Sequence, residues 1–249
     1  MIRVLQSWDE IGEAVSSLER SELPLHGCVQ KNWDHALLRD LLSRRDRSST
    51  VVDLGYGEGH TLRLLSALGF CNLHGVDMRN NWKLRLGQLR WMWRHRSPRP
   101  PFRLHTGDFT KTSFRDSSVD VAVSISAIEH GVDLSVFLKE VRRILVPRGC
   151  LFVTTDYWEE GVRIDPSLRA FGVPWKVFSR DDIAALLRLA EENGLVLQEQ
   201  VSITPCAKRT VHWQKADYTS IALALERSSE ARSGGKVSLG CAREGVVSR

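Results

Sequence analysis

The sequence predicts an α/β protein built on a doubly wound, mostly parallel sheet, and three observations point to this class. Apolar runs of strand length alternate with helical patterns from residue 50 to residue 190, as in parallel sheets that helices cover on both faces. A glycine-rich loop follows the first of these runs. Two late apolar runs have no clear helical pattern between them, which predicts an antiparallel hairpin at one edge of the sheet.

The chain divides into three expected parts. Residues 1–48 form a lead-in that we expect to be helical, because two stretches of it carry apolar residues at helical spacing. Residues 49–227 form the expected α/β domain. Residues 228–249 are rich in Ser, Gly and charge and show no period, which predicts a disordered tail. The expected strands are 50–54, 73–76, 102–105, 119–124, 150–154, 195–201 and 218–225.

The four expected helices of the domain share one pattern, in which apolar residues at helical spacing are followed by a glycine or proline that ends the helix. They cover residues 62–68, 82–93, 134–144 and 179–190. Ser179 and Asp182 occupy the two positions of a capping box at the start of the fourth helix. The apolar stripe of the second helix, which we expect to face the core, consists of Trp82, Leu86, Leu89 and Trp93.

Composition limits the classes of protein that remain. The chain has 249 residues, of which 42% are hydrophobic and 26% charged, so it can bury a core as one elaborated domain and is not mainly disordered. No run approaches the roughly 18 consecutive apolar residues of a membrane span, and acids near the N-terminus argue against a signal peptide. The five cysteines are widely spaced without a CxxC pair, so we expect no metal site and a reducing, cytoplasmic compartment.

The net charge of +5 is unevenly distributed. The segment 79–103 contains eight Lys and Arg residues and no acid, so it carries +8, and the rest of the chain sums to −3. One interpretation is the solvated basic face of a core-packed helix, formed by Lys83, Arg90 and Arg94. The segment is also compatible with attraction of an anionic substrate, such as a phosphorylated or nucleotide-linked sugar, or with RNA binding.

The central motif is VVDLGYGEGH, residues 51–60, in which an apolar strand and Asp53 precede Gly55, Gly57 and Gly59. Glycines suit a loop that turns sharply and lets a ligand approach the backbone, and this edge of an open α/β sheet is the usual binding crevice. The GxGxG spacing matches neither the dinucleotide GxGxxG pattern nor a P-loop. An acid before the glycines suits a cationic ligand, such as an ammonium or a sulfonium, by charge complementarity.

Two further acids follow the next two expected strands. Asp77 ends the second strand and can accept hydrogen bonds from ribose hydroxyls, although an acid there also suits a helix N-terminus. Asp108 follows the third strand and can accept from an adenine amino group, with Phe109 packed on the ring. The alternative for Asp108 is an ordinary turn aspartate.

Five segments in order resemble the class I S-adenosylmethionine-dependent methyltransferases, in particular the type 11, small-molecule branch. They are VVDLGYGEG, GVD, TGDF, SSVDVAVSISAIEHG and FLKEVRRILVPRGCLFVTT. The resemblance implies a Rossmann-like sheet of seven strands with the last antiparallel, and S-adenosylmethionine as cofactor. It places Asp53 and the three glycines at the methionine and ribose side, Asp77 at the ribose, and Asp108 with Phe109 at the adenine. It further implies backbone contacts from Ser126 and Ala127 near the methionine end.

Methyl transfer from a sulfonium requires alignment of nucleophile, methyl and sulfur, and a hydroxyl acceptor also needs a base. Glu129 and His130 follow the fourth strand, and His130 is the best candidate for that base because its ordinary pKa is near neutral. Its alternative role is to order the loop or the cofactor pocket. Asp156 and Tyr157, after the fifth strand, are the next candidates. The aromatic-rich segment 157–178 either roofs the substrate site or packs as a satellite cluster.

The sequence therefore predicts a methyltransferase that acts on oxygen or nitrogen of a small-molecule or glycan-type acceptor. The basic segment 79–103 would suit an anionic acceptor of this kind. Two segments, GVPWKVFSRDDIAALLRLAEENG and VHWQKADYTSIALAL, resemble a bacterial subgroup linked to glycan assembly. Two alternatives stay open. One is an RNA methyltransferase that uses residues 79–103, and the other is a non-catalytic, cofactor-binding partner subunit. The sequence specifies neither the acceptor nor the oligomeric state.

Overall fold

The fold is organised around a nine-stranded sheet in a computed structural model, which describes residues 1–198 and 202–229. The expected tail therefore lies, apart from its first two residues, outside the described part of the chain. The strands are β1 (Ile2–Val4), β2 (Thr50–Leu54), β3 (Asn72–Asp77), β4 (Arg103–Thr106), β5 (Val119–Ile125), β6 (Leu145–Tyr157), β7 (Arg169–Ala170), β8 (Val173–Pro174), β9 (Leu195–Val196), β10 (Val211–Trp213) and β11 (Ala216–Arg227). The helices are α1 (Trp8–Arg20), α2 (Lys31–Leu41), α3 (His60–Ala67), α4 (Trp82–His95), α5 (Leu134–Ile144) and α6 (Arg180–Glu192).

The strand order confirms the predicted sheet. The main path of the nine-stranded sheet is β1-β11-β6-β5-β2-β3-β4, and β9 and β10 also pair with β11. Strands β7 and β8 pair with each other in a separate two-stranded sheet. Strands β2 to β6 pair in parallel, whereas β11 runs antiparallel to β6 from Thr219 opposite Tyr157 to Glu226 opposite Cys150. The carboxyl ends of β2, β3, β4, β5 and β6 thus meet at one edge, where the candidate site lies.

The late hairpin differs in detail from the expectation. The strand that forms a hairpin with β11 is β10 (Val211–Trp213), which pairs with the start of β11 in antiparallel orientation. The run expected as a strand over 195–201 is described as a strand only at Leu195–Val196, where β9 pairs with the end of β11, and residues 199–201 lie outside the described residues. The lead-in also contains a strand that we did not predict, because β1 pairs with Ile221–Leu223 of β11.

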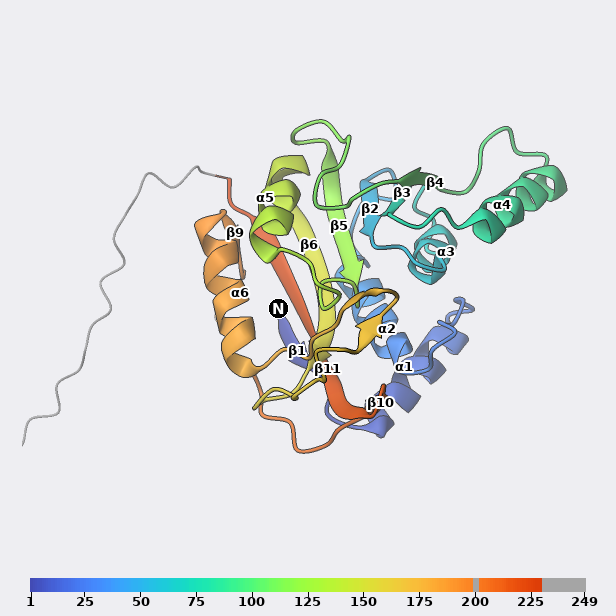
Figure 1. Ribbon diagram of the computed structural model, residues 1–249. Coiled ribbons are helices and arrows are strands. Elements are labelled where there is room, and N and C mark those ends of the chain that lie inside the picture. Colours follow the sequence, from blue (N-terminus) through green and yellow to red (C-terminus); the bar gives the residue numbers. More distant parts are fainter. Residues whose placement is uncertain (199–201, 230–249) are drawn as a thin grey trace, which may run out of the picture.

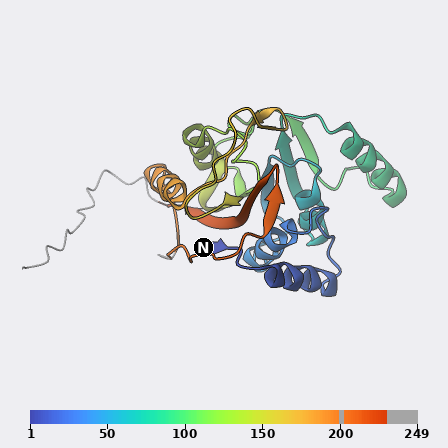
Figure 2. The same cartoon turned by 60° about the horizontal axis from the view of Figure 1, so that its bottom comes forward.

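Helices cover both faces of the sheet, as Figures 1 and 2 show. One core cluster joins α5 and α6 to one face, and a second joins α1, α2 and α3 to the other. The capping box predicted for α6 is present, since Ser179 Oγ accepts from the Asp182 N–H and the Asp182 carboxylate accepts from the Ser179 N–H. Helix α5 ends at Ile144 and β6 begins directly after it, so Pro147-Arg148-Gly149 lies at an irregularity of the strand rather than in a separate turn.

The predicted orientation of α4 is wrong. Its apolar stripe does not face the core, because Trp82 is 64% exposed, Leu89 61% and Trp93 87%. The buried side of the helix consists of Leu84, beside Gly59, and Gln88, whose side-chain amide donates to the Phe102 carbonyl. Helix α4 follows β3 near the sheet edge and projects beyond it (Figure 1), so the rest of the molecule does not cover its outer face.

Within the described residues, no helix is both long and apolar enough to cross a membrane. The same part of the chain holds no group of three or more His, Cys, Asp or Glu side chains that could bind a metal ion.

Candidate active site at the carboxyl edge of the sheet

The glycine loop joins β2 to α3 and adopts a backbone that favours glycine. Gly55 has φ +89° and Gly57 has φ +48°, both in the left-handed region. A Cβ on Gly55 would lie 2.7 Å from the Cβ of Ala127, so only glycine allows β2 and the segment after β5 to approach this closely. A Cβ on Gly57 would meet nothing within 4 Å. The backbone of Gly57 therefore faces open space, as a ligand-contacting loop requires.

Two acids flank this loop, and one of them is left without a partner. Asp53 is buried at the end of β2, and its Oδ2 has no hydrogen-bond partner among the described residues. Burial, together with the charge of Asp77, raises the pKa of Asp53 to about 8. Asp77 is tied to the loop, because its Oδ2 accepts from the Gly57 N–H at 3.0 Å and its Oδ1 accepts from the Arg79 N–H at 2.8 Å. A buried carboxyl without a partner is the feature that a cationic ligand group would satisfy.

The segment after β4 contributes one residue to the loop and one to a local turn. Phe109 would lie 3.6 Å from a Cβ on Gly55 and stands edge-on to Phe137 at 5.9 Å between ring centroids. Asp108 is exposed, and its Oδ1 accepts from the N–H and the hydroxyl of Thr110, both at 2.8 Å. Asp108 thus shapes the turn that presents Phe109, and its contact with adenine stays a prediction.

Ser126 and Ala127 follow β5 and bring the two halves of the site together. Ala127 is buried against Gly55. Ser126 has φ +48°, and its N–H donates to the Thr154 carbonyl at 3.0 Å, which fixes the turn after β5 to β6. The Ser126 hydroxyl accepts from the ammonium group of Lys31. A side chain of the lead-in therefore reaches the centre of the site.

Lys31, which begins α2, is not among the site residues that we predicted from the sequence. Its Nζ lies 3.6 Å from Asp34 Oδ2 and 3.9 Å from Asp156 Oδ1. Burial lowers its pKa, but the charges of Asp34, Asp156 and Glu129 together raise it above the usual value, so the side chain stays cationic. Helical spacing places Lys31 on the same face of α2 as the buried His35 and Leu38, but it does not show that this face meets the site.

Three buried carboxyl groups surround this ammonium group. Burial, then the charge of Asp156, raises the pKa of Glu129 to about 8, although Lys31 opposes the shift and Thr155 Oγ1 donates to Glu129 Oε2 at 3.1 Å. Burial likewise raises the pKa of Asp34 to about 6. Asp156 Oδ2 accepts from the indole N–H of Trp175 at 2.9 Å. Hydrogen bonds hold Glu129 and Asp156 in place, whereas neither oxygen of Asp34 has a hydrogen-bond partner among the described residues. Lys31 is the cation whose charge acts on all three carboxyl groups.

His130 stands beside this group. Its Nδ1 is buried without a hydrogen-bond partner in the described structure, and its ring meets Phe171 edge-on at 5.3 Å. Burial lowers the pKa of His130, and Lys31 lowers it further, while Asp156 acts in the opposite direction. The imidazole is therefore neutral at pH 7 and able to accept a proton. Tyr157 does not join the group, because its fully buried side chain lies in the core cluster that includes Phe178.

An aromatic wall stands next to His130. Trp175 meets Trp213 at 4.7 Å and Tyr218 at 5.7 Å between ring centroids, and Phe171 stacks on Trp213 at 6.3 Å. Trp175 and Tyr218 belong to a separate small core cluster, which agrees with the interpretation of segment 157–178 as a satellite cluster; a role as the roof of the substrate site stays a prediction. The segment forms a satellite cluster, and through Trp175 and Phe171 that cluster contacts Asp156 and His130.

Comparison with known proteins agrees with this arrangement. Residues 52–153, which run from β2 into β6, match the family model described as a methyltransferase domain. This part of the chain is therefore similar to a methyltransferase domain. The predicted fold is confirmed, and the match to this model agrees with the predicted family and cofactor. The roles of the individual site residues stay predictions.

Two curated relatives match part of the chain. The chain is 30% identical over 133 residues to dimethylglycine N-methyltransferase of Parasynechococcus marenigrum, and this alignment covers 52% of this chain and 45% of that protein. It is 27% identical over 159 residues to 2-methyl-6-phytyl-1,4-hydroquinone methyltransferase of Synechocystis sp., with 59% and 46% covered. The chain thus spans less than half the length of these relatives.

Solved structures share the fold of the methyltransferase domain at low sequence identity. Geranyl diphosphate C-methyltransferase from Streptomyces coelicolor, in complex with Mg²⁺, geranyl diphosphate and S-adenosyl-L-homocysteine, superposes with a TM-score of 0.59 at 18% identity, covering 87% of this chain and 83% of the other. A putative sarcosine dimethylglycine methyltransferase from Galdieria sulphuraria gives 0.58 at 15% identity, with 88% and 99% covered.

The residues of the loop fit S-adenosylmethionine. The unpartnered Oδ2 of Asp53 suits the cationic end of the cofactor, because a cation bound beside it would lower the raised pKa of this carboxyl and favour the carboxylate. The open backbone at Gly57 lets a ligand approach. Each oxygen of Asp77 accepts one backbone N–H and keeps a second lone pair for a ribose hydroxyl. Bound there, S-adenosylmethionine supplies an activated methyl group.

Proposed function

We propose that this protein transfers a methyl group from S-adenosylmethionine to an oxygen or nitrogen atom of a small-molecule acceptor, with His130 as the proton acceptor. The observation that carries the proposal is the buried, unpartnered Nδ1 of His130 at the carboxyl edge of the sheet. The curated relatives support a small-molecule acceptor, because their names refer to dimethylglycine and to a hydroquinone. An anionic acceptor agrees with the geranyl diphosphate bound by the similar structure.

The chain has two tasks in this reaction. It must align the acceptor atom with the methyl group, because holding the reacting atoms in line lowers the barrier to transfer. It must also take the proton that the acceptor loses. A neutral His130 performs the second task. The imidazolium that forms lies in the field of Asp156, whose charge favours the protonated ring. Asp156 itself is held in place by Trp175 and faces the ammonium of Lys31.

Lys31 is a positioning residue in this scheme. Its ammonium contacts the Ser126 hydroxyl on the cofactor side and faces Asp156 on the acceptor side. It therefore fixes the distance between the two halves of the site. Burial raises the pKa of Glu129, so this carboxyl carries less negative charge at neutral pH than an exposed glutamate would.

The experiment is a methyl-transfer assay over a panel of amines, hydroquinones, phosphorylated sugars, glycans and RNA, with the product identified by mass spectrometry. We expect methylation of a small-molecule or glycan acceptor, and we expect His130→Gln to lose turnover while the shift in melting temperature on adding S-adenosylhomocysteine persists. Full turnover by His130→Gln would exclude the base, and methylation of RNA alone would exclude the acceptor class.

The pH profile gives a second readout. Because the neutral imidazole is the active form and the pKa of His130 is lowered, kcat/KM should stay high at pH 7 and fall on acidification, with an apparent pKa below the ordinary histidine value of about 6.5. With a hydroxyl acceptor, an acid limb at or above that value would contradict the assignment of His130; an amine acceptor adds an acid limb at its own pKa, because only the neutral amine attacks the methyl group.

A further inference from the structure

Helix α4 presents an apolar stripe to solvent. At about 100° per residue, Trp82, Leu86, Leu89 and Trp93 fall within about 60° of the helix circumference. All four side chains are exposed, and they lie opposite the buried Leu84 and Gln88. A contiguous exposed apolar face of this kind is rare on a monomeric protein and marks an interaction surface.

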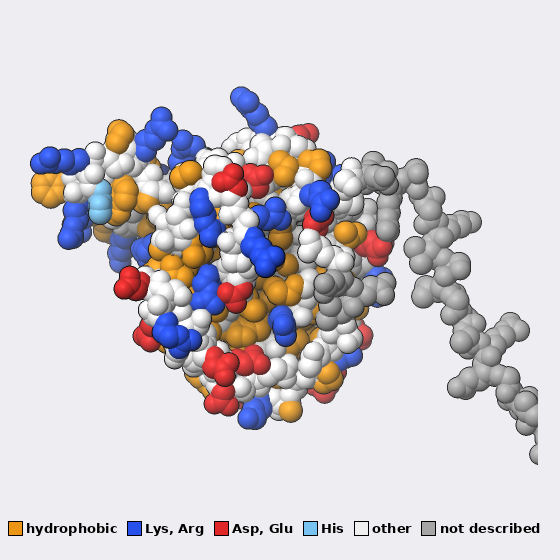
Figure 3. All heavy atoms as spheres, turned by 180° about the vertical axis from the view of Figure 1, so that it is seen from behind, with side chains coloured by type: hydrophobic (Ala, Val, Ile, Leu, Met, Phe, Trp, Pro, Cys, Tyr) orange, Lys and Arg blue, Asp and Glu red, His pale blue; other side chains and the backbone are white. Residues whose placement is uncertain are grey.

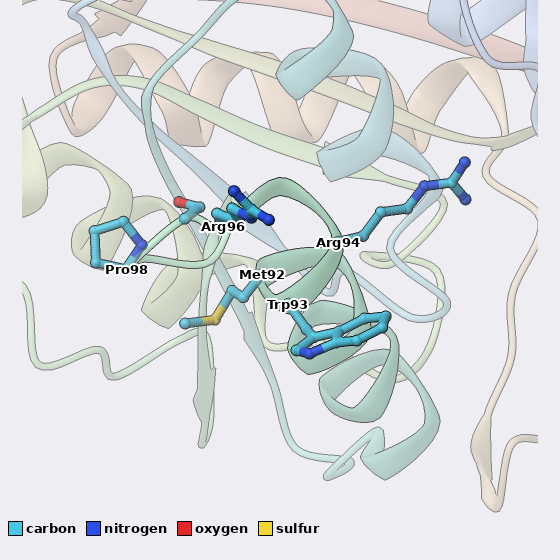
Figure 4. A pocket seen from close by; sticks show the side chains of 6 residues that line it. Met92, Trp93, Arg94, Arg96 and Pro98 are labelled. Atoms are coloured by element: carbon cyan, nitrogen blue, oxygen red, sulfur yellow. The ribbon is translucent and has the colours of Figure 1, made fainter.

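The stripe is flanked by positive charge. Lys83, Arg90 and Arg94 lie about 60–120° around the helix from the middle of the stripe, and the segment 79–103 contains no acid. Figure 3 shows Lys/Arg and hydrophobic side chains standing together on the projecting helix. A shallow pocket at the C-terminal end of α4 is lined by both apolar and basic side chains, which Figure 4 shows. Its lining residues are Met92, Trp93, Arg94, Arg96, Ser97 and Pro98.

The apolar stripe together with its flanking cations favours one of three candidate partners. An apolar protein core would cover the stripe but would bury the neighbouring cations without counter-charges. RNA would neutralise the cations but offers Leu86 and Leu89 no apolar medium. The interface of an anionic bilayer satisfies both groups, since tryptophan and leucine side chains enter the acyl boundary and Lys and Arg contact the acidic headgroups. We propose that α4 docks this protein on anionic membrane surfaces.

The position of α4 gives this docking a consequence for the active site. The helix begins beside the glycine loop, where Asn81 Nδ2 donates to the Gly57 carbonyl at 3.1 Å. Just before it, the Arg79 guanidinium lies 5.8 Å from the ring centroid of Phe171, which contacts His130. Phe171 is itself 71% exposed. The first turn of α4 therefore lies at the rim of the active site, and a membrane bound to the stripe would lie on the side of the helix that faces away from the glycine loop.

The test is co-sedimentation of the full chain with vesicles of phosphatidylcholine, either pure or containing about one third phosphatidylglycerol. We expect binding to the anionic vesicles that weakens with salt, and little binding to the neutral ones. The double variant W82S/W93S and the double variant R90E/R94E should each bind the anionic vesicles at least tenfold more weakly. Circular dichroism confirms that each variant is folded.

Matched controls come from other faces of the molecule. Trp8→Ser removes a tryptophan on α1 that is 53% exposed, and K139E/R188E reverses two exposed charges on α5 and α6. Both should bind like the unaltered chain. Absence of binding to anionic vesicles at low salt, equal loss in the controls, or α4-dependent binding of RNA or of a second copy without vesicle binding would each overturn the proposal. The readout needs no turnover, so it is independent of the proposed methyl transfer.

Discussion

Replacing Lys31 by methionine tests the coupling between the lead-in and the methyltransferase domain. The substitution keeps the length of the side chain but removes the only ammonium group that the described structure places 3.6 Å from Asp34 and 3.9 Å from Asp156. Removing one partner of a buried ion pair costs about 3–5 kcal/mol, because the other charge stays buried without compensation. For a chain of this size, that corresponds to a fall of about 6–20 °C in melting temperature.

The sign of the pH dependence follows from the carboxyl groups. Lys31 lowers the pKa of Asp34 and of Glu129, which nevertheless stand at about 6 and about 8, above their ordinary values. Without Lys31 both rise further. A carboxyl whose pKa is raised on folding destabilises the folded state progressively as the pH rises through that pKa. The deficit of Lys31→Met should therefore be small near pH 5 and grow toward pH 8.

The assay is urea unfolding of the unaltered chain and of Lys31→Met at a series of pH values, with Lys139→Met on the exposed face of α5 as the matched control. The control should lie within about 0.5 kcal/mol of the unaltered chain at every pH, as surface substitutions usually do. Equal destabilisation by the two variants, or a deficit of Lys31→Met that shrinks as the pH rises, would refute the buried network.

Two further substitutions test the site. Gly55→Ala should lose more stability in urea unfolding and more cofactor affinity in calorimetry than Gly57→Ala. Both substitutions incur the strain of a left-handed backbone, about 1–3 kcal/mol, but only a Cβ on Gly55 also meets a neighbouring Cβ, at 2.7 Å. Equal losses would contradict the close approach. Trp175→Phe should lower the free energy of unfolding by about 1–3 kcal/mol and reduce turnover, because it removes the indole N–H that donates to the buried Asp156. An unchanged urea midpoint together with an unchanged turnover rate would show that this hydrogen bond does not matter.

The sequence was sufficient for the sheet and its helices because their signals are local. Apolar runs between glycines and prolines located β2, β3 and β5 within one residue at either end, and the Ser179–Asp182 pair identified the start of α6. The three-residue β1 gave no such signal, because its pairing with β11 joins residues more than 200 positions apart. Pairing at that separation leaves no periodic pattern in a short segment.

The site and α4 show where periodicity stops being informative. A helical stripe reveals that apolar residues share a face but not what that face meets, and the stripe from Trp82 to Trp93 meets solvent. Lys31 enters the site only because α2 packs against the carboxyl edge, which depends on tertiary structure. The case of Tyr157 is different, since neighbours in a strand point to opposite faces. We predicted both Asp156 and Tyr157 as candidates, but this alternation allows only one of the two to face the site, and Tyr157 lies in the core.

The most direct measurement is calorimetric titration of the protein with S-adenosylhomocysteine. We predict binding to the unaltered chain, and at least tenfold weaker binding to Asp77→Ala, because that residue holds the Gly57 N–H and faces the expected ribose position. The exposed Asp181→Ala on α6 should bind like the unaltered chain. Absence of binding by the unaltered chain, or equal affinity for Asp77→Ala, would contradict the placement of the cofactor on the glycine loop.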